Sequence, residues 1–236
     1  MPFLLKKRRL RPEIMDQPGL APDLHVQALR GLQRINFLSG SSGIYWPWIR
    51  SAANSVAPRP LRILDLATGG GDVPIRLWQK AQRTGLNLHI EGCDRSATAI
   101  SHAQALAAAQ AASVRFFTRD VLQGPLPERY DALLCSLFLH HLDEHQAVDL
   151  VRRMAEAAAV MILVNDLVRG PFGFALAYVA SRVLSTSPVV HSDGPQSVAG
   201  AFTVREMREL AERAGLKEAI VKRRWPFRMM LRWNKT

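Results

Sequence analysis

Short apolar runs recur along most of the chain, and amphipathic stretches lie between them. The runs predict strands at residues 61–66, 88–93, 114–118, 132–138, 160–164 and 219–222. The intervening stretches predict helices at residues 72–84, 96–112, 144–157 and 203–214. A strand as continuously apolar as LLCSLFL (133–139) must be covered on both faces. The pattern therefore predicts an α/β fold in which helices flank a mostly parallel sheet.

Two segments fall outside this alternation. Near the N-terminus, residues 22–40 and 44–56 predict two helices with a GSSG break between them at 40–43. Residues 170–202 form an insertion after the fifth strand, where an apolar segment precedes a loop rich in Pro, Ser and Gly (SPVVHSDGPQS). This insertion is interpreted either as a lid over an apolar substrate or as a packed surface helix. We predict a basic tail and helical cap at residues 1–58, and a ligand-binding domain at 59–236 that carries the lid-like insertion.

The composition is that of a globular protein, since 48% of the 236 residues are hydrophobic and 22% are charged. The net charge of +11 lies at the two ends, with five bases before Glu13 and six after Glu218. Because the chain between them is formally neutral, a nucleic-acid partner is not favoured. The basic ends are interpreted either as tails that contact an anionic membrane surface or an acidic partner, or as solvated ends that aid solubility.

The N-terminal segment and the two cysteines together predict the cellular compartment. No apolar segment follows the first basic residues, so we predict a cytoplasmic protein and leave open a peripheral contact at the inner membrane face. The apolar stretch 172–184 contains Arg182 and is too short to span a bilayer. Cys93 and Cys135 lie far apart and make neither a metal-binding pair nor a disulfide framework. We therefore expect no metal site and a reducing compartment.

A glycine-rich turn follows the first strand and opens the next helix. In DLATGGGD, which ends at Asp72, three consecutive glycines leave no Cβ between the backbone and a ligand. A P-loop would need GK[ST] after the glycines, and the dinucleotide fingerprint would need a glycine where Pro74 stands. The carboxylate of Asp72 would also repel a pyrophosphate. An adenosine ligand that carries a sulfonium and an ammonium avoids this repulsion.

Acidic residues also follow the next two strands. Asp94 ends the second strand, where a carboxylate can accept hydrogen bonds from both hydroxyls of a ribose. Asp120 follows the third strand and can accept a hydrogen bond from an adenine amino group. Aspartates at strand ends often only cap helices or turns. Three acids after three successive strands, together with the glycine-rich turn, nevertheless favour an adenosine site.

These motifs together resemble the class I S-adenosylmethionine-dependent methyltransferases over roughly residues 60–223. RILDLATGGGD resembles the first motif of that family, with Ala67 where glycine is commoner, and EGCD resembles the second. TRDVL matches the segment that carries the adenine-side acid, and YDALLCSLFLHHL resembles the fourth strand and the loop after it. The resemblance implies a doubly wound, Rossmann-like, mostly parallel seven-stranded sheet with an N-terminal helical cap and an insertion after strand 5.

The same resemblance implies S-adenosylmethionine as the cofactor. It assigns cofactor contacts to Asp65, Ala67, Thr68, Gly69, Gly71, Asp94, Arg95, Asp120, Val121 and Ser136. The order and spacing of the motifs are similar to those of ubiquinone/menaquinone-type enzymes and of O-methyltransferases that act on phenolic or polyketide products. Subgroups that act on nucleic acid often carry [DNS]PP[YFW] after the fourth strand, where this chain has SLFL (136–139). This difference argues against a nucleic-acid substrate.

Candidate catalytic residues follow the fourth strand. His140 and His141 lie where the reactive methyl group should point, and an imidazole titrates near neutrality, so it can accept a phenolic proton. We predict that His141, and after it His140, acts as a general base or orients the acceptor oxygen. Alternatively, both shape the cofactor pocket or satisfy backbone groups, and catalysis proceeds by alignment alone. His191, Asp166 and Arg34 are predicted to contact the acceptor.

The favoured function is transfer of a methyl group from S-adenosylmethionine to an oxygen of a small hydrophobic phenolic, quinol or polyketide acceptor, by a monomer or homodimer. Three alternatives stay open. The acceptor atom is a carbon of a quinone-type ring, or the chain is a non-catalytic adenosylmethionine-binding partner subunit of a biosynthetic complex. The third alternative is an NAD(P)-dependent oxidoreductase, against which Pro74 and Asp72 argue.

Overall fold

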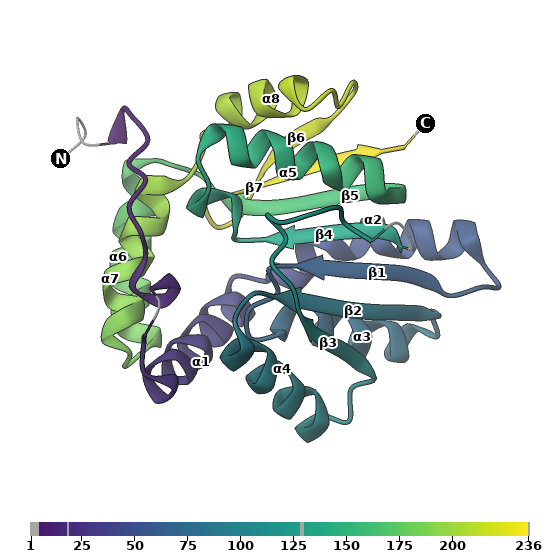
Figure 1. Cartoon of the computed structure of the whole chain (residues 1–236), viewed down its shortest axis with the longest axis horizontal. Helices are drawn as coiled ribbons and strands as arrows, with labels where there is room; N and C mark the ends of the chain where they lie inside the picture. Colours follow the sequence, from purple (N-terminus) through teal and green to yellow (C-terminus); the bar gives the residue numbers. More distant parts are fainter. Residues whose placement is uncertain (1–4, 18, 128–129, 236) are drawn as a thin grey trace.

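A mostly parallel seven-stranded sheet forms the centre of the computed structural model, which describes residues 5–17, 19–127 and 130–235. Its strands are β1 (Leu61–Leu66), β2 (Leu88–Asp94), β3 (Val114–Thr118), β4 (Tyr130–Ser136), β5 (Ala158–Leu167), β6 (Ile220–Arg224) and β7 (Arg228–Asn234). They lie in the order β3-β2-β1-β4-β5-β7-β6 (Figure 1). Strands β1 to β5 pair in parallel, whereas β7 is antiparallel to both β5 and β6. The predicted α/β fold and its seven-stranded sheet are confirmed.

Helices cover both faces of this sheet, as its apolar strands require. One face packs against α2 (Ser41–Val56) and α3 (Asp72–Thr84), and α4 (Ala97–Ala109) packs beside α3. The other face packs against α5 (Glu144–Ala157) and α8 (Val204–Arg213). Successive residues of one strand serve opposite faces, because side chains alternate along a strand. Leu133 thus joins the cluster with α5 and α8, and Leu134 joins the cluster with α2 and α3.

A third group of helices closes the carboxyl edge of the sheet (Figure 1). It consists of α1 (Pro22–Leu38), α6 (Pro171–Leu184), α7 (Pro188–Gly200) and the 3₁₀ helix η2 (Ile14–Asp16). Ala28 of α1 packs against Val189 and Val190 of α7, and residues of η2 join the same cluster. A second 3₁₀ helix, η3 (Leu139–His141), lies between β4 and α5. The cap is therefore built jointly by the N-terminal segment and by the insertion after β5.

The stretch rich in Pro, Ser and Gly at residues 187–197 is mostly helical, so the prediction of a loop there was wrong. Pro195 lies inside α7, and the carbonyl group of His191 that it leaves free accepts a hydrogen bond from Arg182 (3.4 Å). Gly194 allows α7 to approach α6, because a Cβ on it would lie 3.3 Å from a serine of α6. Proline and glycine in this segment therefore serve helix packing.

The basic ends are not free tails, which corrects the expectation from the sequence. Arg8 lies against η3 and donates hydrogen bonds to the carbonyl oxygens of Gly200 (2.5 Å) and His140 (3.1 Å). At the other end, the bases after Glu218 lie in or directly after β6 and β7, and Arg228 is only 3% exposed. Much of the excess charge is thus carried by ordered elements, and contact with an anionic membrane stays a prediction.

Several boundaries also differ from the pattern along the chain. The strand predicted at 132–138, for example, is β4 and ends at Ser136. The break expected at 40–43 is confined to the start of α2, which begins directly after Gly40 (φ +66°). Ser41 is already helical, and its hydroxyl accepts a hydrogen bond from Arg228 (2.6 Å). The sequence pattern predicts no separate strand at the position of β7. Its sequence, RMMLRWN, lacks β-branched residues and resembles the rest of the basic end.

Within the described residues, no helix is long and apolar enough to cross a membrane. The division of the chain at residues 58 and 59 stays a prediction. Residues 1–4 and 236, which are the outermost parts of the two predicted domains, lie outside the described residues.

Candidate functional site

A cavity of about 630 Å³ opens at the carboxyl ends of β1, β2 and β4. Its walls come from the loops after these strands, from α1, α6 and α7, and from residues 10–16 of the N-terminal segment. Small-molecule sites typically have volumes of about 300–1,000 Å³. The cavity therefore has the size of a small-molecule site and lies where parallel sheets bind their ligands.

The turn between β1 and α3 forms one side of this cavity. Ala67, Gly69 and Gly71 have positive φ values of 50°, 53° and 75°. A Cβ on Gly71 would lie 2.7 Å from the ring of Phe116 and 2.8 Å from Ala103, so only glycine fits there. The tight turn thus brings backbone N–H groups near the start of α3 close to any bound ligand.

Two buried carboxylates beside this turn each have one oxygen without a hydrogen-bond partner among the described residues. Thr68 donates a hydrogen bond to Oδ2 of Asp65 (2.6 Å), whereas Oδ1 has no partner. Asn36 donates to Oδ1 of Asp72 (3.4 Å), whereas Oδ2 has no partner. Burial raises the pKa of Asp65 to about 7 and that of Asp72 to about 6. Both residues line the cavity, so a cationic ligand would stabilise their ionised forms.

Asp94 ties the end of β2 to the glycine-rich turn. Its two carboxylate oxygens accept hydrogen bonds from the backbone N–H groups of Gly69 and Ser96, each at 2.9 Å. Burial raises the pKa of Asp94, and these backbone donors oppose the rise. Asp120, after β3, accepts hydrogen bonds from Leu122 N–H (2.9 Å) and from the amide of Gln123 (3.0 Å). Both acids therefore face the cavity with their orientation fixed by local donors.

The structure brings most of the predicted cofactor contacts to one cavity. The wall includes Asp65, Ala67, Thr68, Gly69, Asp94, Arg95, Asp120, Val121 and Ser136. Gly71 lies behind the wall, where its contacts with Phe116 and Ala103 shape the turn. Ser136 accepts a hydrogen bond from the Asn165 amide (3.3 Å) at the ends of β4 and β5.

His140 and His141 lie on η3 at another side of the cavity. Nδ1 of the buried His140 lies 2.6 Å from Oδ1 of Asp166, and its backbone N–H donates to Oδ2 of the same carboxylate (3.0 Å). Nδ1 of His141 lies 2.6 Å from Oδ2 of Asp16, and 19% of its side chain is exposed. Burial alone would raise the pKa of Asp166, but the neighbouring His140 brings it below its ordinary value. Each imidazole is therefore oriented through Nδ1 by its own carboxylate.

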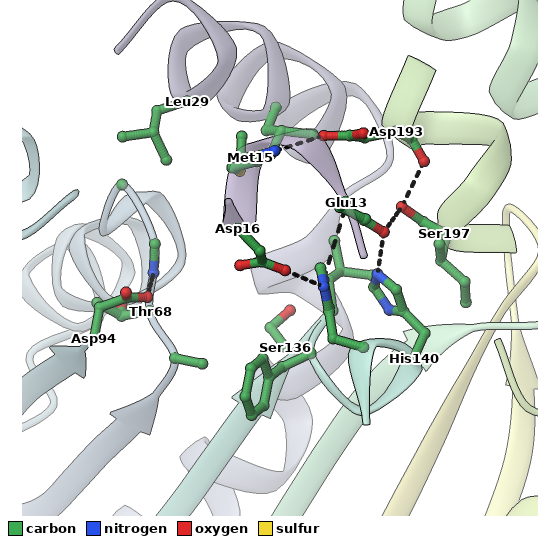
Figure 2. A pocket seen from close by; sticks show the side chains of 18 of the residues that line it. Glu13, Met15, Asp16, Leu29, Thr68, Asp94, Ser136, His140, Asp193 and Ser197 are labelled. Carbon is green, nitrogen blue, oxygen red and sulfur yellow. Dashed lines mark hydrogen bonds and ion pairs between the residues drawn. The ribbon is translucent and has the colours of Figure 1, made fainter. Parts of the chain in front are cut away.

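The N-terminal strap, which we define as residues 5–17, covers this histidine pair (Figure 2). Glu13 in the strap is 7% exposed, and its carboxylate lies near the Nε2 atoms of both imidazoles. Its Oε1 lies 3.6 Å from Nε2 of His140, and its Oε2 lies 3.9 Å from Nε2 of His141. Ser197 donates a hydrogen bond to Oε1 (2.6 Å). Burial raises the pKa of Glu13 to about 7.

Other contacts of the strap fix its position. Asp193 of α7 accepts hydrogen bonds from the backbone N–H groups of Ile14 and Met15, each at 3.0 Å. Asp16 pairs with Arg95 after β2 (3.2 Å). Neither Glu13 nor Asp16 was predicted from the sequence as a site residue. Their only signal was the presence of two acids in EIMD within an otherwise basic segment, and no local pattern connects them to histidines more than a hundred residues away.

The three residues predicted to contact the acceptor do not lie on the cavity wall. Asp166 is 1% exposed and is held behind His140 by the contacts described above. Nε2 of His191 lies 2.7 Å from the carbonyl oxygen of Ser185, because α7 turns this residue toward the end of α6. Arg34 donates to the carbonyl oxygen of Leu184 (2.7 Å) on the exposed side of α1. In this structure Asp166 positions His140, whereas His191 and Arg34 hold the cap together.

Comparison with known proteins extends this picture. Residues 63–159 match the family model described as methyltransferase domain. Over 128 residues, which are 53% of this chain, the sequence is 31% identical to the demethylmenaquinone methyltransferase of Deinococcus radiodurans. That match spans 52% of the relative, so the chain matches about half the length of this curated protein.

Solved structures share the architecture over most of the chain. The apo form of the S-adenosylmethionine-dependent methyltransferase SibL has a TM-score of 0.67 at 18% identity, and the match covers 96% of this chain and 63% of that one. Magnesium protoporphyrin IX methyltransferase from Synechocystis PCC 6803, with bound S-adenosylhomocysteine, has a TM-score of 0.57 at 16% identity. That match covers 94% of this chain and 91% of the other. The protein thus has the class I S-adenosylmethionine-dependent methyltransferase fold. Within this fold, residues 63–159, which are less than half of the chain, are similar to the methyltransferase domain of the family model.

Proposed function

We propose that the protein is an enzyme that transfers a methyl group from S-adenosylmethionine to an oxygen of a small hydrophobic phenolic, quinol or polyketide acceptor. One observation carries this proposal: a single cavity joins two chemically different ends. One end has a glycine-rich turn and partly unpartnered carboxylates, and the other has a histidine pair next to apolar side chains. Such a cavity suits a cationic nucleoside beside an apolar acceptor.

The residues at the first end fit S-adenosylmethionine. The free oxygens of Asp65 and Asp72 can accept from an ammonium group and offset a sulfonium charge. Asp94 can accept from ribose hydroxyls, and Asp120 from the adenine amino group. When bound, this cofactor supplies an electrophilic methyl group on a positively charged sulfur. The chain's own contribution is to hold the charges, align the acceptor and exclude water.

The second end suits an apolar ring with a hydroxyl group. Leu32 and Ile35 of α1, Phe138 after β4 and Val190 of α7 all line the cavity. The histidine pair lines the same cavity and offers a polar group to an acceptor hydroxyl there. We assign His141 to the acceptor oxygen, where it orients the hydroxyl or accepts its proton. Because the cap closes over this end, the reacting groups are shielded from water.

Calorimetry and methyl-transfer assays test the proposal together. S-adenosylhomocysteine should bind with one site per chain, and NADH should not bind. Methyl-labelled S-adenosylmethionine should transfer label to at least one member of a panel of phenols, quinols and aromatic polyketides. Binding of NADH in place of S-adenosylhomocysteine would overturn the cofactor assignment. Cofactor binding with no transfer to any acceptor would support a non-catalytic partner subunit.

Methylation of a ring carbon is a second candidate function. The 31% identity to a demethylmenaquinone methyltransferase supports it, because the acceptor of that relative is a quinone-type molecule. The apolar cap residues would suit such a ring equally well. ¹³C NMR of the product after transfer of a ¹³C-methyl group distinguishes the two outcomes, since a methoxy carbon and a ring methyl carbon give separate signals.

Loss of the Asp94 carboxylate should weaken cofactor binding. Asp94→Ala removes a charged hydrogen-bond acceptor for the ribose, a contribution of about 1.5–3 kcal/mol, so affinity for S-adenosylhomocysteine should fall about 10- to 100-fold. Calorimetry measures the change. Asp23→Ala, at an exposed position of α1, is the matched control and should bind like the parent. Equal affinity of Asp94→Ala and the parent would remove Asp94 from the site.

Cofactor affinity should also depend on pH through Asp65. Because burial raises the pKa of this carboxyl to about 7, it is mostly protonated below that pH and ionises as the pH rises. A cationic ligand favours the ionised form, so the Kd for S-adenosylmethionine should fall on the order of tenfold between pH 5.5 and pH 7. Calorimetry across this range measures it. Asp65→Asn should bind more weakly and flatten the dependence, and an unchanged slope would exclude Asp65 as its source.

A further inference from the structure

Three potential metal ligands lie close together where the N-terminal strap meets η3. Glu13, His140 and His141 each offer one ligand atom, and these atoms all lie within 4.8 Å of one another. The separations of the Glu13 oxygens from the two Nε2 atoms are 3.6 and 3.9 Å, which is longer than a direct hydrogen bond. The three groups therefore lie close together, without a direct hydrogen bond between Glu13 and either imidazole.

The orientation of both imidazoles is that of histidines prepared to bind a metal ion. Nδ1 of His140 lies 2.6 Å from Asp166, and Nδ1 of His141 lies 2.6 Å from Asp16. A carboxylate on Nδ1 holds the proton there and leaves the Nε2 lone pair free to act as a ligand. Both free Nε2 atoms point toward the same carboxylate, that of Glu13. Hydrogen bonds from carboxylates to the outer nitrogen of ligand histidines are the usual support of metal sites.

We propose that Glu13, His140 and His141 bind a divalent transition-metal ion. Two imidazole nitrogens and one carboxylate oxygen form a ligand set that suits zinc, iron(II), cobalt and similar ions. Three protein ligands leave further coordination positions open, as in catalytic sites. All three residues line the cavity, so an open position is accessible to a bound molecule. The ion would also offset the repulsion of Glu13 by Asp16 and Asp193.

The role of the ion's open coordination position rests on the proposed function, whereas binding of the ion to the three residues does not. A hydroxyl group of the acceptor that coordinates the ion would lose its proton to solvent more readily and would be held beside the cofactor end of the cavity. In addition, Glu13 lies in the strap and both histidines lie on η3, so the ion would fasten the strap over the cavity. No metal site was predicted from the sequence, because the ligands come from distant segments and not from a cysteine pair.

Cobalt(II) binding tests the site directly. The full chain is treated with a chelator, dialysed, and titrated with cobalt(II) chloride while visible absorption and calorimetry are recorded. We expect one ion per chain, with an absorption spectrum of nitrogen and oxygen ligation. Glu13→Gln keeps the size of the side chain and the acceptor for Ser197 but loses the charge, so cobalt affinity should fall at least about 100-fold. His145→Ala, an exposed histidine of α5, is the matched control and should bind like the parent.

A second variant and a second ligand keep the result interpretable. Asp16→Asn replaces Oδ2, which supports His141, and keeps Oδ1 as an acceptor for Arg95, and cobalt affinity should fall about 10- to 100-fold. Binding of S-adenosylhomocysteine should stay at the parental level in both variants, which shows that they are folded. Absence of saturable cobalt binding in the parent, or parental affinity in both variants, would overturn the metal site. Loss of S-adenosylhomocysteine binding by the parent would instead contradict the proposed function, and cobalt binding would still decide the metal site.

Discussion

His141→Ala is expected to lower kcat about 10²- to 10⁴-fold, the usual contribution of a positioned proton-transfer group. His141 lies on η3, lines the cavity and has 19% of its side chain exposed, so it is accessible to an acceptor. Asp16 holds its Nδ1 at 2.6 Å, which leaves Nε2 for the reacting oxygen or for an ion that binds that oxygen. Steady-state kinetics with methyl-labelled S-adenosylmethionine and the best acceptor of the panel measure the change.

Cofactor binding provides the control for this experiment. The glycine-rich turn and its carboxylates lie at the other end of the cavity, so His141→Ala should bind S-adenosylhomocysteine like the parent. His145→Ala should leave both turnover and binding unchanged, since this residue is exposed on α5. Near-normal turnover of His141→Ala with intact cofactor binding would remove His141 from the mechanism. Catalysis by alignment alone would then be the remaining explanation.

The same variant separates two chemical roles of His141. A metal ligand would be needed for both turnover and cobalt binding, so His141→Ala would lose both. A general base without a metal would be needed for turnover only, and cobalt binding would then be absent in the parent as well. These outcomes depend on different measurements, so the catalytic assignment and the metal site can fail independently.

The cofactor end of the site was predictable from the sequence because its determinants are local. A glycine-rich turn after β1 and acids after β2 and β3 each follow a strand directly, and parallel strands bring their carboxyl ends to one edge. Positive φ at Gly69 and Gly71 is likewise a property of the turn itself. Once the strands are recognised, the sheet topology places Asp65, Asp94 and Asp120 around one cavity without further information.

The acceptor end was less predictable because distant segments build it. Glu13 meets His140 only when the strap is folded back over η3. This position depends on hydrogen bonds to Asp193 and on those from the Arg8 side chain to backbone carbonyl groups of η3. Proline in α7 is a poor predictor of a loop here, because Arg182 satisfies the carbonyl group that Pro195 leaves free. Basic residues at the C-terminus resemble a tail in the sequence. In the structure, Arg228 is buried and donates hydrogen bonds to Ser41 of α2 and to Ser39, so these residues are part of the sheet.

Gly71→Ala is expected to lower the free energy of unfolding by about 2–5 kcal/mol. A non-glycine residue in the left-handed region costs about 1–2 kcal/mol, and Gly71 has a φ of +75°. Overpacking adds about 1–3 kcal/mol, because the new Cβ would lie 2.7 Å from Phe116 and 2.8 Å from Ala103. Urea denaturation measures the change, and an unchanged m-value would show that the transition is still two-state.

Gly85→Ala separates the two costs at the other end of the same helix. Gly85 follows α3 with a φ of +67°, and a Cβ on it would meet nothing within 4 Å. This variant should therefore lose only the conformational part, about 1–2 kcal/mol. Equal destabilisation by the two variants would show that crowding against Phe116 contributes nothing.

The crowding at Gly71 should also weaken ligand binding. A Cβ on Gly92 would likewise lie 2.9 Å from the ring of Phe116, so this ring is enclosed between β2 and the turn and cannot move freely. Gly71→Ala must therefore displace the turn itself, and affinity for S-adenosylhomocysteine should fall, whereas Gly85→Ala should bind like the parent. Adding Phe116→Leu should relieve part of the strain, so the double variant should be more stable than the sum of the single effects implies. Strict additivity would contradict the steric explanation, because the ring is the nearest obstacle to the new Cβ.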